Sequence, residues 1–430
     1  MLLLHISDIH FREPDCVNPD TDPDRPYRTR MIQDVRRRVE AIGGPVNALL
    51  VGGDIAFKGH IGEYEVAKAW IDELAQACGC HRERIFVVPG NHDVDRSVIS
   101  GSAAVRNTQS AIMNAGLERR EREFRTQFMD PDTGRLLFRP IEAYNDFAKL
   151  FNCQIFSPDR LYWKQDLPLE GGVNLRIYGL TSILMSGVGG RDDAPGGLYL
   201  SPLQTTLDPV DDVVNLVMCH HPPDWFSDHD EVDEKICNRA AIHLFGHKHR
   251  QRLAKDDTYI RFSAGAVNPD RGEIGWQPAY NLIEVRVVGE GADRALEVEA
   301  RLLQWQANPE QYRPVQTRSG EDVFRHRISI PGRRVTVMPI SATDTPAAPS
   351  SSAEADVEAS MSDEGTRNLV FRFWGLTMRQ RREIALKLAL IDREELKLPE
   401  PERYGRALLR ASERGVLDQV ANEVAQREKS

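Results

Sequence analysis

The sequence predicts an α/β fold for most of the chain and a small all-helical domain at its C-terminal end. Three observations support this prediction. Short apolar runs alternate with helical patterns through the N-terminal part, which is typical of an α/β architecture. Residues 341–366 contain no Leu, Ile or aromatic residue, so they cannot bury enough apolar surface to offset the entropy of folding. Helical spacing of apolar residues resumes after this stretch.

The apolar runs of the N-terminal part are the expected strands. Each run is short and ends at Gly, Ser, Pro or a polar residue, as buried strands do. These runs occupy residues 2–7, 47–53, 84–90, 175–182, 213–220 and 240–247. Helical patterns lie between the first of them, at 27–43 and 63–79. Polar and apolar residues alternate, as in antiparallel strands, at 259–265, 280–288 and 295–305. We therefore expect a sheet that changes from mixed to antiparallel, or two stacked sheets.

The range from about residue 94 to 172 departs from this alternation. Apolar residues recur there at nearly helical spacing among many Arg and Glu, for example at Ile112, Phe124 and Phe128. The same spacing returns at Tyr144 and Phe147. We expect two or three amphipathic helices that are inserted into the α/β domain.

The chain is thus expected to have three parts. Residues 1–335 would form the α/β domain, and 336–366 would be a disordered linker rich in Ser, Pro, Ala and acidic residues. Residues 367–430 would form three or four short helices, because apolar stripes such as Ile384, Leu388 and Ile391 follow one helix face.

Composition and charge exclude several classes of protein. The chain has 430 residues and a formal net charge of −10, which argues against a surface that grips nucleic acid as a whole. It lacks the run of about 18 apolar residues that a transmembrane helix needs, so we expect no membrane association. The start, MLLLHISDIH, has no basic leader and is interpreted as a strand rather than a signal peptide. Six scattered cysteines without a CxxC pair suggest a reducing cytoplasm.

Five short polar motifs follow the expected strands. Each puts Asp, Asn or His where a strand becomes a loop, which is where α/β folds build their sites. The motifs are Asp8-Ile9-His10, Gly53-Asp54, Gly90-Asn91-His92-Asp93, Cys219-His220-His221 and Gly246-His247-Lys248-His249. Their oxygen and nitrogen donors suit Mn, Fe, Zn, Ni or Co better than Ca, which prefers oxygen alone.

These five motifs, in this order, resemble those of the calcineurin-like metallophosphoesterase superfamily, DxH…GD…GNH(D/E)…H…GHxH. The likeness extends over roughly residues 1–300, and all five motifs are intact. SDIHF, GNHDVDR, HHPP and FGHKH look most like the bacterial cyclic-nucleotide-phosphodiesterase branch. The serine/threonine phosphatase branch has GDxVDRG, whereas this chain continues from Gly53-Asp54 with IAFKG.

The resemblance implies two packed β-sheets flanked by helices, and a centre of two divalent transition-metal ions. By the family pattern, the first ion is held by Asp8, His10 and His249. The second is held by Asn91, His220 and His247, and Asp54 bridges both. The ions could be Mn, Fe, Zn or Ni, with Mn the choice for an assay.

The resemblance also implies a reaction. Two such ions clamp phosphoryl oxygens and generate hydroxide at neutral pH. We therefore expect a phosphoesterase, and a phosphodiesterase rather than a phosphomonoesterase, that acts on a cyclic nucleotide or another phosphodiester. His92, beside a ligand but free of metal, would protonate the leaving oxygen or stabilise the transition-state charge.

Other residues near the motifs are given secondary roles. Arg12 and Arg96 flank the motifs and are expected substrate-binding residues, since a guanidinium binds phosphate through two hydrogen bonds. His221 should point to the opposite face of the strand from His220, and is interpreted as an outer residue. His5 and His243 lie within strands and are interpreted as core histidines.

Two alternatives stay open on the sequence alone. The chain could be a nuclease effector of a bacterial defence or signalling system, recruited through 367–430, since the superfamily also contains nucleases. It could instead be a non-catalytic metal-containing scaffold. The helical spacing of 367–430 resembles small death-fold-like, effector-associated adaptor domains, which implies a protein partner or self-association through this domain.

Overall fold

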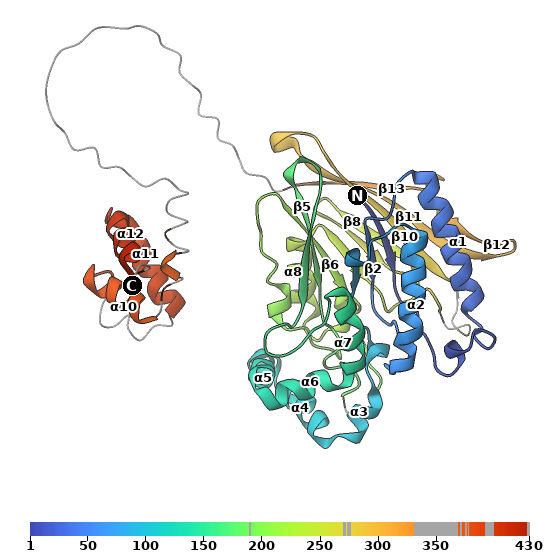
Figure 1. Cartoon of the computed structure of the whole chain (residues 1–430), viewed down its shortest axis with the longest axis horizontal. Coiled ribbons are helices and arrows are strands. Elements are labelled where there is room, and N and C mark those ends of the chain that lie inside the picture. The colour runs from blue at the N-terminus through green and yellow to red at the C-terminus, as the bar shows by residue number, and fades with distance from the viewer. Residues whose placement is uncertain are drawn as a thin grey trace, which may run out of the picture. The chain divides into compact units, whose positions relative to one another are not determined.

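A computed structural model describes residues 1–188, 191–269, 272, 277–330, 369, 372–374, 376, 378–391 and 400–427. The chain divides into two compact units, Met1–Val337 and Met338–Ser430, each of which is described by itself (Figure 1). The linker expected at 336–366 lies outside the described residues.

The first sheet of the N-terminal unit is mixed. Its strand order is β12-β11-β10-β1-β2-β3, and β13 also pairs with β11. Strands β1, β2 and β3 are parallel, whereas β10 runs antiparallel to β1. The strands are β1 (Leu2–Ile6), β2 (Ala48–Val51), β3 (Ile85–Val87), β10 (Ala279–Val288), β11 (Ala295–Ala307), β12 (Glu310–Pro314) and β13 (Phe324–Ser329).

The second sheet is mixed as well, with the order β4-β5-β6-β7-β9-β8. Its central strands β5, β6, β7 and β9 are parallel, and the edge strands β4 and β8 are antiparallel to their neighbours. The strands are β4 (Trp163–Pro168), β5 (Asn174–Gly179), β6 (Val213–Cys219), β7 (Ile242–Phe245), β8 (Arg252–Asp256) and β9 (Tyr259–Ser263).

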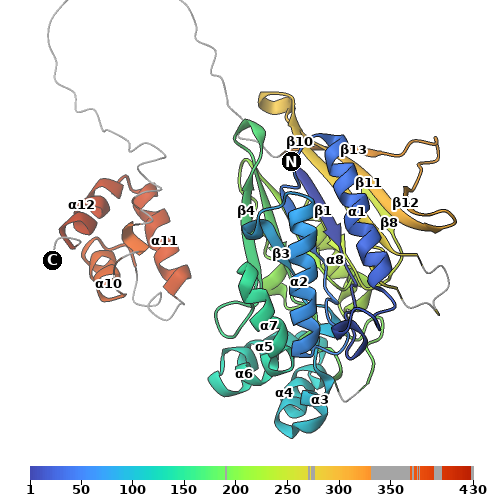
Figure 2. The ribbon, with the colours of Figure 1, turned by 45° about the vertical axis from the view of Figure 1, so that its right-hand side comes forward.

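Helices cover the outer faces of the two sheets. Figure 2 shows α1 (Arg25–Ile42) and α2 (Ile61–Ala77) beside the first sheet. On the second sheet, α8 (His229–Arg239) shares an apolar cluster with strands β5, β6 and β7. The two sheets share a larger apolar core, and because both faces are covered, every residue of β1 and β6 is buried. The predicted α/β fold of two mixed sheets flanked by helices is confirmed.

Five helices gather at one end of this unit (Figure 1), where two or three were expected. Capping side chains start new helices within the stretch of helical spacing. Ser102 Oγ accepts a hydrogen bond from the amide of Val105, and Asp130 caps a helix that has Pro131 in its first turn. The expected range 94–172 also contains β4, which belongs to the second sheet. The helices are α3 (Arg96–Gly101), α4 (Ala103–Asn114), α5 (Leu117–Met129), α6 (Pro131–Phe138) and α7 (Glu142–Ala148).

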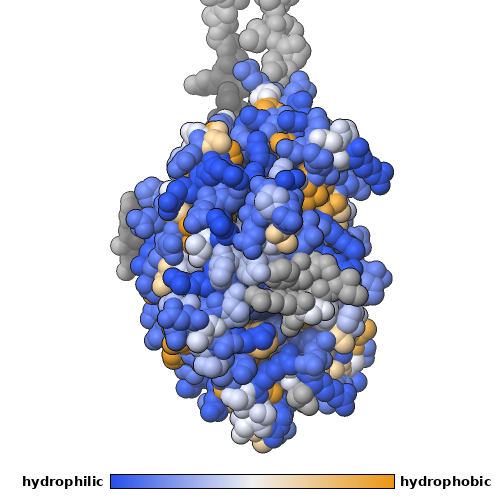
Figure 3. All heavy atoms as spheres, turned by 90° about the vertical axis from the view of Figure 1, so that its right-hand side faces the viewer, coloured by the Kyte–Doolittle hydropathy of each residue, from blue (hydrophilic) through white to orange (hydrophobic). Residues whose placement is uncertain are grey.

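The surface of the N-terminal unit is largely polar on the face that Figure 3 shows, where apolar side chains form small separate groups. This face therefore offers no broad apolar area. In the described part of the chain, no helix has both the length and the apolar character that a membrane crossing requires.

The C-terminal unit is helical, as predicted. It contains α10 (Met378–Lys387), α11 (Glu400–Glu413) and α12 (Leu417–Arg427). Tyr404 is fully buried against Phe373 and Trp374, and Glu423 forms ion pairs with Lys387 and Arg427. The apolar core also includes Leu369, Leu376, Ile384, Ala385, Leu390, Ile391, Ala407, Leu408, Ala411, Val420 and Val424.

A chain that ends at Val337 is expected to fold without the C-terminal unit. The reason is that, among the described residues, each unit builds its apolar core from its own side chains, so the larger core should form without the smaller one. Thermal unfolding followed by circular dichroism should give a Tm for the sheet domain within about 2 °C of that in the full chain. Aggregation of the truncated chain, or a Tm lower by about 5 °C or more, would contradict this separation.

Candidate metal centre

The expected site residues meet where the parallel strands of both sheets end. Asp8 and His10 follow β1, Asp54 follows β2, and Asn91 and His92 follow β3 in the first sheet. The second sheet supplies three more histidines after β6 and β7, namely His220, His247 and His249. Because the carboxyl ends of the parallel strands in the two stacked sheets lie at the same end of the domain, these loops converge there.

Asp54 lies close to donor atoms of both expected metal positions. The donor atoms of Asp8, His10 and His249 lie within 4.8 Å of one another, and Asp54 forms a second such group with Asp8 and His220. Asp54 Oδ2 lies 3.4 Å from His10 Nε2 and 3.2 Å from His220 Nε2. One carboxylate therefore reaches residues of both expected metal positions.

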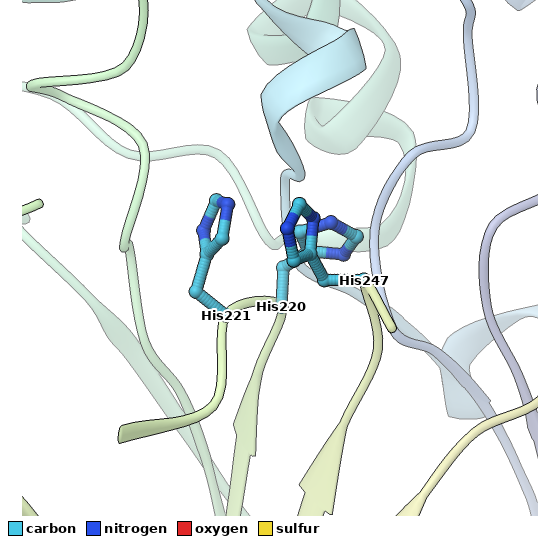
Figure 4. Close-up of side chains that lie close together, drawn as sticks. All are labelled: His220, His221 and His247. Carbon is cyan, nitrogen blue, oxygen red and sulfur yellow. The ribbon is translucent and has the colours of Figure 1, made fainter. Parts of the chain in front are cut away.

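The second expected position gathers His220, His247 and Asn91. His220 Nε2 lies 3.2 Å from Asn91 Oδ1, and the ring centroids of His220 and His247 are 5.3 Å apart. Figure 4 shows His221 beside this pair. The expectation that His221 faces away is wrong. Since β6 ends at Cys219, the alternation of a strand does not apply to the two residues that follow.

In two of these rings, a backbone carbonyl determines which nitrogen carries the proton. His220 Nδ1 donates to Gly52 O at 2.9 Å, and His10 Nδ1 donates to Asn268 O at 3.2 Å. A carbonyl only accepts, so Nε2 of each neutral ring keeps its lone pair. This is the tautomer in which Nε2 binds a metal. Asn268 could not be recognised from residue type or spacing, because the group that acts is a main-chain oxygen.

The loops that carry the donors are held in an uncommon conformation. The φ angle is positive at five of the seven expected ligands: Asp8 (56°), His10 (54°), Asp54 (51°), His247 (68°) and His249 (52°). The left-handed region is unfavourable for residues with a Cβ atom, though Asp, Asn and His enter it more readily than others. Such strain clusters at functional sites, where the surrounding structure enforces it.

Two motif glycines leave room for the donors. A Cβ atom at Gly90 would lie 2.2 Å from Asp54 Oδ1, and one at Gly53 would lie 2.7 Å from His220 Nδ1. Gly53 also has a φ of 100°, which side chains rarely tolerate. Glycine is therefore needed at position 53 for the close approach of the two sheets, and at position 90 for the close approach of two loops of the first sheet.

Asp93 ties the loop of Asp54 to the turn of Asn91 and His92. Its buried carboxylate accepts the amides of Ile55, Ala56 and Gly90 at 2.8–3.1 Å and the Tyr64 hydroxyl at 2.8 Å. Burial, and then the charge of Asp54, raise the pKa of Asp93 above its usual range. Asp93 therefore supports these two loops structurally.

Charges in the centre favour cation binding. Burial by itself would raise the pKa of Asp8 and Asp54, but hydrogen bonds and charge from neighbouring histidines hold both pKa values below the usual range. Burial lowers the pKa of His247 to about 3, so this ring is neutral. Burial would also lower the pKa of His220, but Asp54 raises it to about 9, so a cation would have to displace that proton.

The residues fit two divalent transition-metal ions. The donors are carboxylate and amide oxygens and imidazole nitrogens, a mixed set that suits Mn, Fe, Zn or Ni. Asp54 lies near donors of both expected positions, and an acidic residue there would offset part of the repulsion between two cations.

His92 lies beside the donors but is anchored elsewhere. Its Nδ1 donates to Phe57 O at 2.9 Å, its ring stacks on Phe57 at 4.8 Å, and its amide donates to Asp54 Oδ1 at 2.7 Å. Burial, and then the charge of His10, lower the pKa of His92, although Asp54 opposes the shift. The ring is thus fixed at the edge of the centre, and its Nε2 takes no part in the hydrogen bond to Phe57 O.

Each of the two expected arginines lines a cavity that His92 also lines. The Arg12 guanidinium lies 3.7 Å from the Phe57 ring centroid and lines a cavity of about 420 Å³ with His10, His92 and His249. Arg96 forms an ion pair with Asp192 and lines a second cavity of about 300 Å³ with Asn91 and His92. Both residues therefore border space next to the expected metal positions.

Residues 1–251, more than half of the chain, match the family model of the calcineurin-like phosphoesterases. The chain belongs to the calcineurin-like phosphoesterase family. This phosphoesterase also matches, over residues 365–426, the model of the GTPase-associated adaptor domain, in agreement with the adaptor predicted for the C-terminal unit.

Individual relatives of this phosphoesterase are distant. It is 33% identical over 95 residues to the uncharacterized metallophosphoesterase-like protein YydB of Bacillus subtilis, an alignment that covers 22% of this chain and 18% of YydB. It is 10% identical to Vps29 of Chaetomium thermophilum (77% and 100% covered, TM-score 0.30) and 9% identical to GAP50 of Plasmodium (78% and 90% covered, TM-score 0.34). At these TM-scores, the likeness to the two solved structures says nothing about chemistry.

Replacement of Gly90 by alanine is expected to damage the centre. The new methyl group would overlap the Asp54 carboxylate, so Asp54 or the Asn91 turn must shift, and metal affinity should fall by at least ~10-fold. Gly44→Ala is the control, because a Cβ atom there meets nothing within 4 Å. The metal content of both variants is measured after equilibrium dialysis. Equal content in the two variants would show that Gly90 does not position Asp54.

Proposed function

We propose that this chain is a phosphodiesterase that depends on two divalent cations and acts on a small phosphodiester, such as a cyclic nucleotide. The observation that carries the proposal is the position of Asp54, whose Oδ2 lies within 3.4 Å of His10 Nε2 and 3.2 Å of His220 Nε2. A carboxylate between two histidine-rich donor sets suits a pair of cations and not a single one.

Each residue of the centre has a role in this proposal. The first position is formed by Asp8, His10 and His249, the second by Asn91, His220 and His247, and Asp54 serves both. When bound, two such ions would polarise the phosphoryl group and activate water. The protein residues fix the positions: carbonyls orient His10 and His220, and Asp93 holds the loops that carry Asp54 and Asn91.

His92 would transfer a proton to the leaving oxygen. Phe57 O accepts from Nδ1, so a neutral ring has no proton on Nε2, and only the imidazolium can act as an acid there. Burial favours the neutral ring, but an anionic phosphate beside it favours the charged form. Alternatively, the charged ring would stabilise negative charge as it develops in the transition state.

The cavities beside His92 support a small diester. A diester carries two substituents on phosphorus, and His92 lines two cavities that could receive them. The larger cavity contains three carboxylates, of Asp15, Asp22 and Asp24, against the guanidiniums of Arg12 and Arg28, and Asp22 is already paired with Arg28. A polynucleotide would bring further phosphates toward this acidic lining, at a cost in repulsion. A neutral sugar or base is a better occupant.

The adaptor match supports a second part of the proposal. The match to a GTPase-associated adaptor domain suggests that the hydrolase is recruited to a protein partner. The recruiting residues would be those of the C-terminal unit, which contributes no residue to the expected metal centre. This recruitment would equally suit the nuclease alternative.

The chain that ends at Val337 should keep its rate on a small diester and lose association with a partner or with itself. The six unpaired cysteines support a cytoplasmic setting.

A substrate panel tests the proposed reaction. Full-length protein loaded with Mn²⁺ should hydrolyse cyclic nucleotides or a bis-nitrophenyl phosphate diester faster than phosphomonoesters, single-stranded or duplex DNA, or RNA. Cleavage of nucleic acid without cleavage of small diesters would favour the nuclease alternative. Absence of all hydrolysis in protein that contains two ions would favour the scaffold.

His92→Ala tests the role of this ring separately. We expect kcat to fall by ~10²–10⁴-fold with metal content unchanged, as for loss of a general acid. A diester with a nitrophenolate leaving group should lose less, because that leaving group needs no proton. His326→Ala, at a half-buried position on β13 where the ring contacts Asp256 O and not the centre, is the control. Equal losses with good and poor leaving groups would argue for charge stabilisation alone.

A further inference from the structure

His221 is buried next to the second metal position, although the family pattern assigns only His220 of this motif to the metal. Its ring centroid lies 4.5 Å from that of His247 and 4.9 Å from that of His220, and its side chain is fully buried. The donor nitrogens of these three histidines lie within 4.8 Å of one another. In Figure 4 the three side chains rise from neighbouring strand ends into the same space.

One nitrogen of His221 lacks a partner in the described part of the chain. Nδ1 lies 2.8 Å from Ser182 Oγ, whereas the buried Nε2 has no hydrogen bond. A buried polar atom is rarely left unsatisfied in a folded protein, so an unpaired nitrogen beside two metal-binding histidines needs an explanation. A cation at the second position would satisfy it.

The surroundings hold the ring ready for such a bond. If Ser182 Oγ accepts from Nδ1, Nε2 carries the lone pair, which is the form that binds a metal. Trp225 packs against both His221 and His247, with ring centroids 5.6 Å and 4.0 Å away.

We propose that His221 Nε2 is an additional ligand of the cation at the position of Asn91, His220 and His247. The inference rests on the proposed function in one respect, which is that this position holds a cation. It makes the two positions chemically unequal. The second would have three imidazole nitrogens, whereas the first has two, from His10 and His249, together with the Asp8 carboxylate. Nitrogen ligands favour Zn²⁺, Ni²⁺ or Co²⁺ over Mn²⁺, so the second position should select these ions.

Metal binding by the full chain tests the proposal without relying on activity. Titration calorimetry with Zn²⁺ should show two sites in the wild type, one of which weakens by at least ~10–100-fold in His221→Ala. Ser182→Ala keeps the ring but removes its Nδ1 partner, so it should weaken the same site less. His243→Gln is the matched control, because His243 is equally buried but hydrogen-bonded to Ala240 O, away from the centre.

The visible spectrum of the Co²⁺-loaded protein gives a second readout. Loss of a nitrogen ligand should change the position and intensity of the d–d bands in His221→Ala and leave them unaltered in His243→Gln. If His221→Ala does not fold, as judged by circular dichroism, His221→Gln is measured instead, with the same expected loss of affinity.

The outcomes separate this inference from the proposed function. Two Zn²⁺ sites of wild-type affinity and an unchanged Co²⁺ spectrum in the His221 variant would overturn the role of His221 and leave the phosphodiesterase proposal intact. Weakened binding in that variant, in a protein that hydrolyses no phosphoester, would support His221 and contradict the proposed function. A wild-type chain in which Zn²⁺ binds only at the Asp8 position would overturn both.

Discussion

Asp54 Oδ2 lies 3.4 Å from His10 Nε2, on a loop of the first sheet, and 3.2 Å from His220 Nε2, on a loop of the second. At this edge, the contact of the buried Asp54 carboxylate with one imidazole from each sheet therefore sets the distance between the two sheets. A buried carboxylate is costly unless it is paired, and Asp54 is paired on both sides. The rest of the centre follows from the need to keep this carboxylate in place.

Several features that look separate serve that one requirement. Gly90 and Gly53 lack the Cβ atoms that would displace Asp54 and His220. Asp93 collects main-chain amides from the loop after Asp54 and from the turn before Asn91, which joins the two loops. The left-handed backbone at Asp54 itself is tolerated because these contacts determine it from several directions. His92 joins the same network, since its amide donates to Asp54 Oδ1.

The sequence predicted what depends on residue type and spacing, and missed what depends on geometry. Short apolar runs predicted the strands of both mixed sheets, and the motif residues predicted which side chains converge at the strand ends. His221 was misplaced because the alternation rule was carried past Cys219, where β6 ends. Asn268 escaped notice because it acts through its main-chain oxygen, and Phe57 because a ring that stacks on His92 resembles any apolar residue in the sequence. The five inserted helices were undercounted because their boundaries depend on single capping residues such as Asp130.

The central claim is that one carboxylate serves two cations, and Asp54→Asn tests it most directly. Asparagine keeps the shape of the side chain and removes its charge, so a loss cannot be attributed to a cavity. The account predicts that metal analysis of this variant will show reduced occupancy of both positions, and that hydrolysis of a small diester will be lost. Two ions per chain, bound with wild-type affinity and accompanied by near-wild-type turnover, would contradict it.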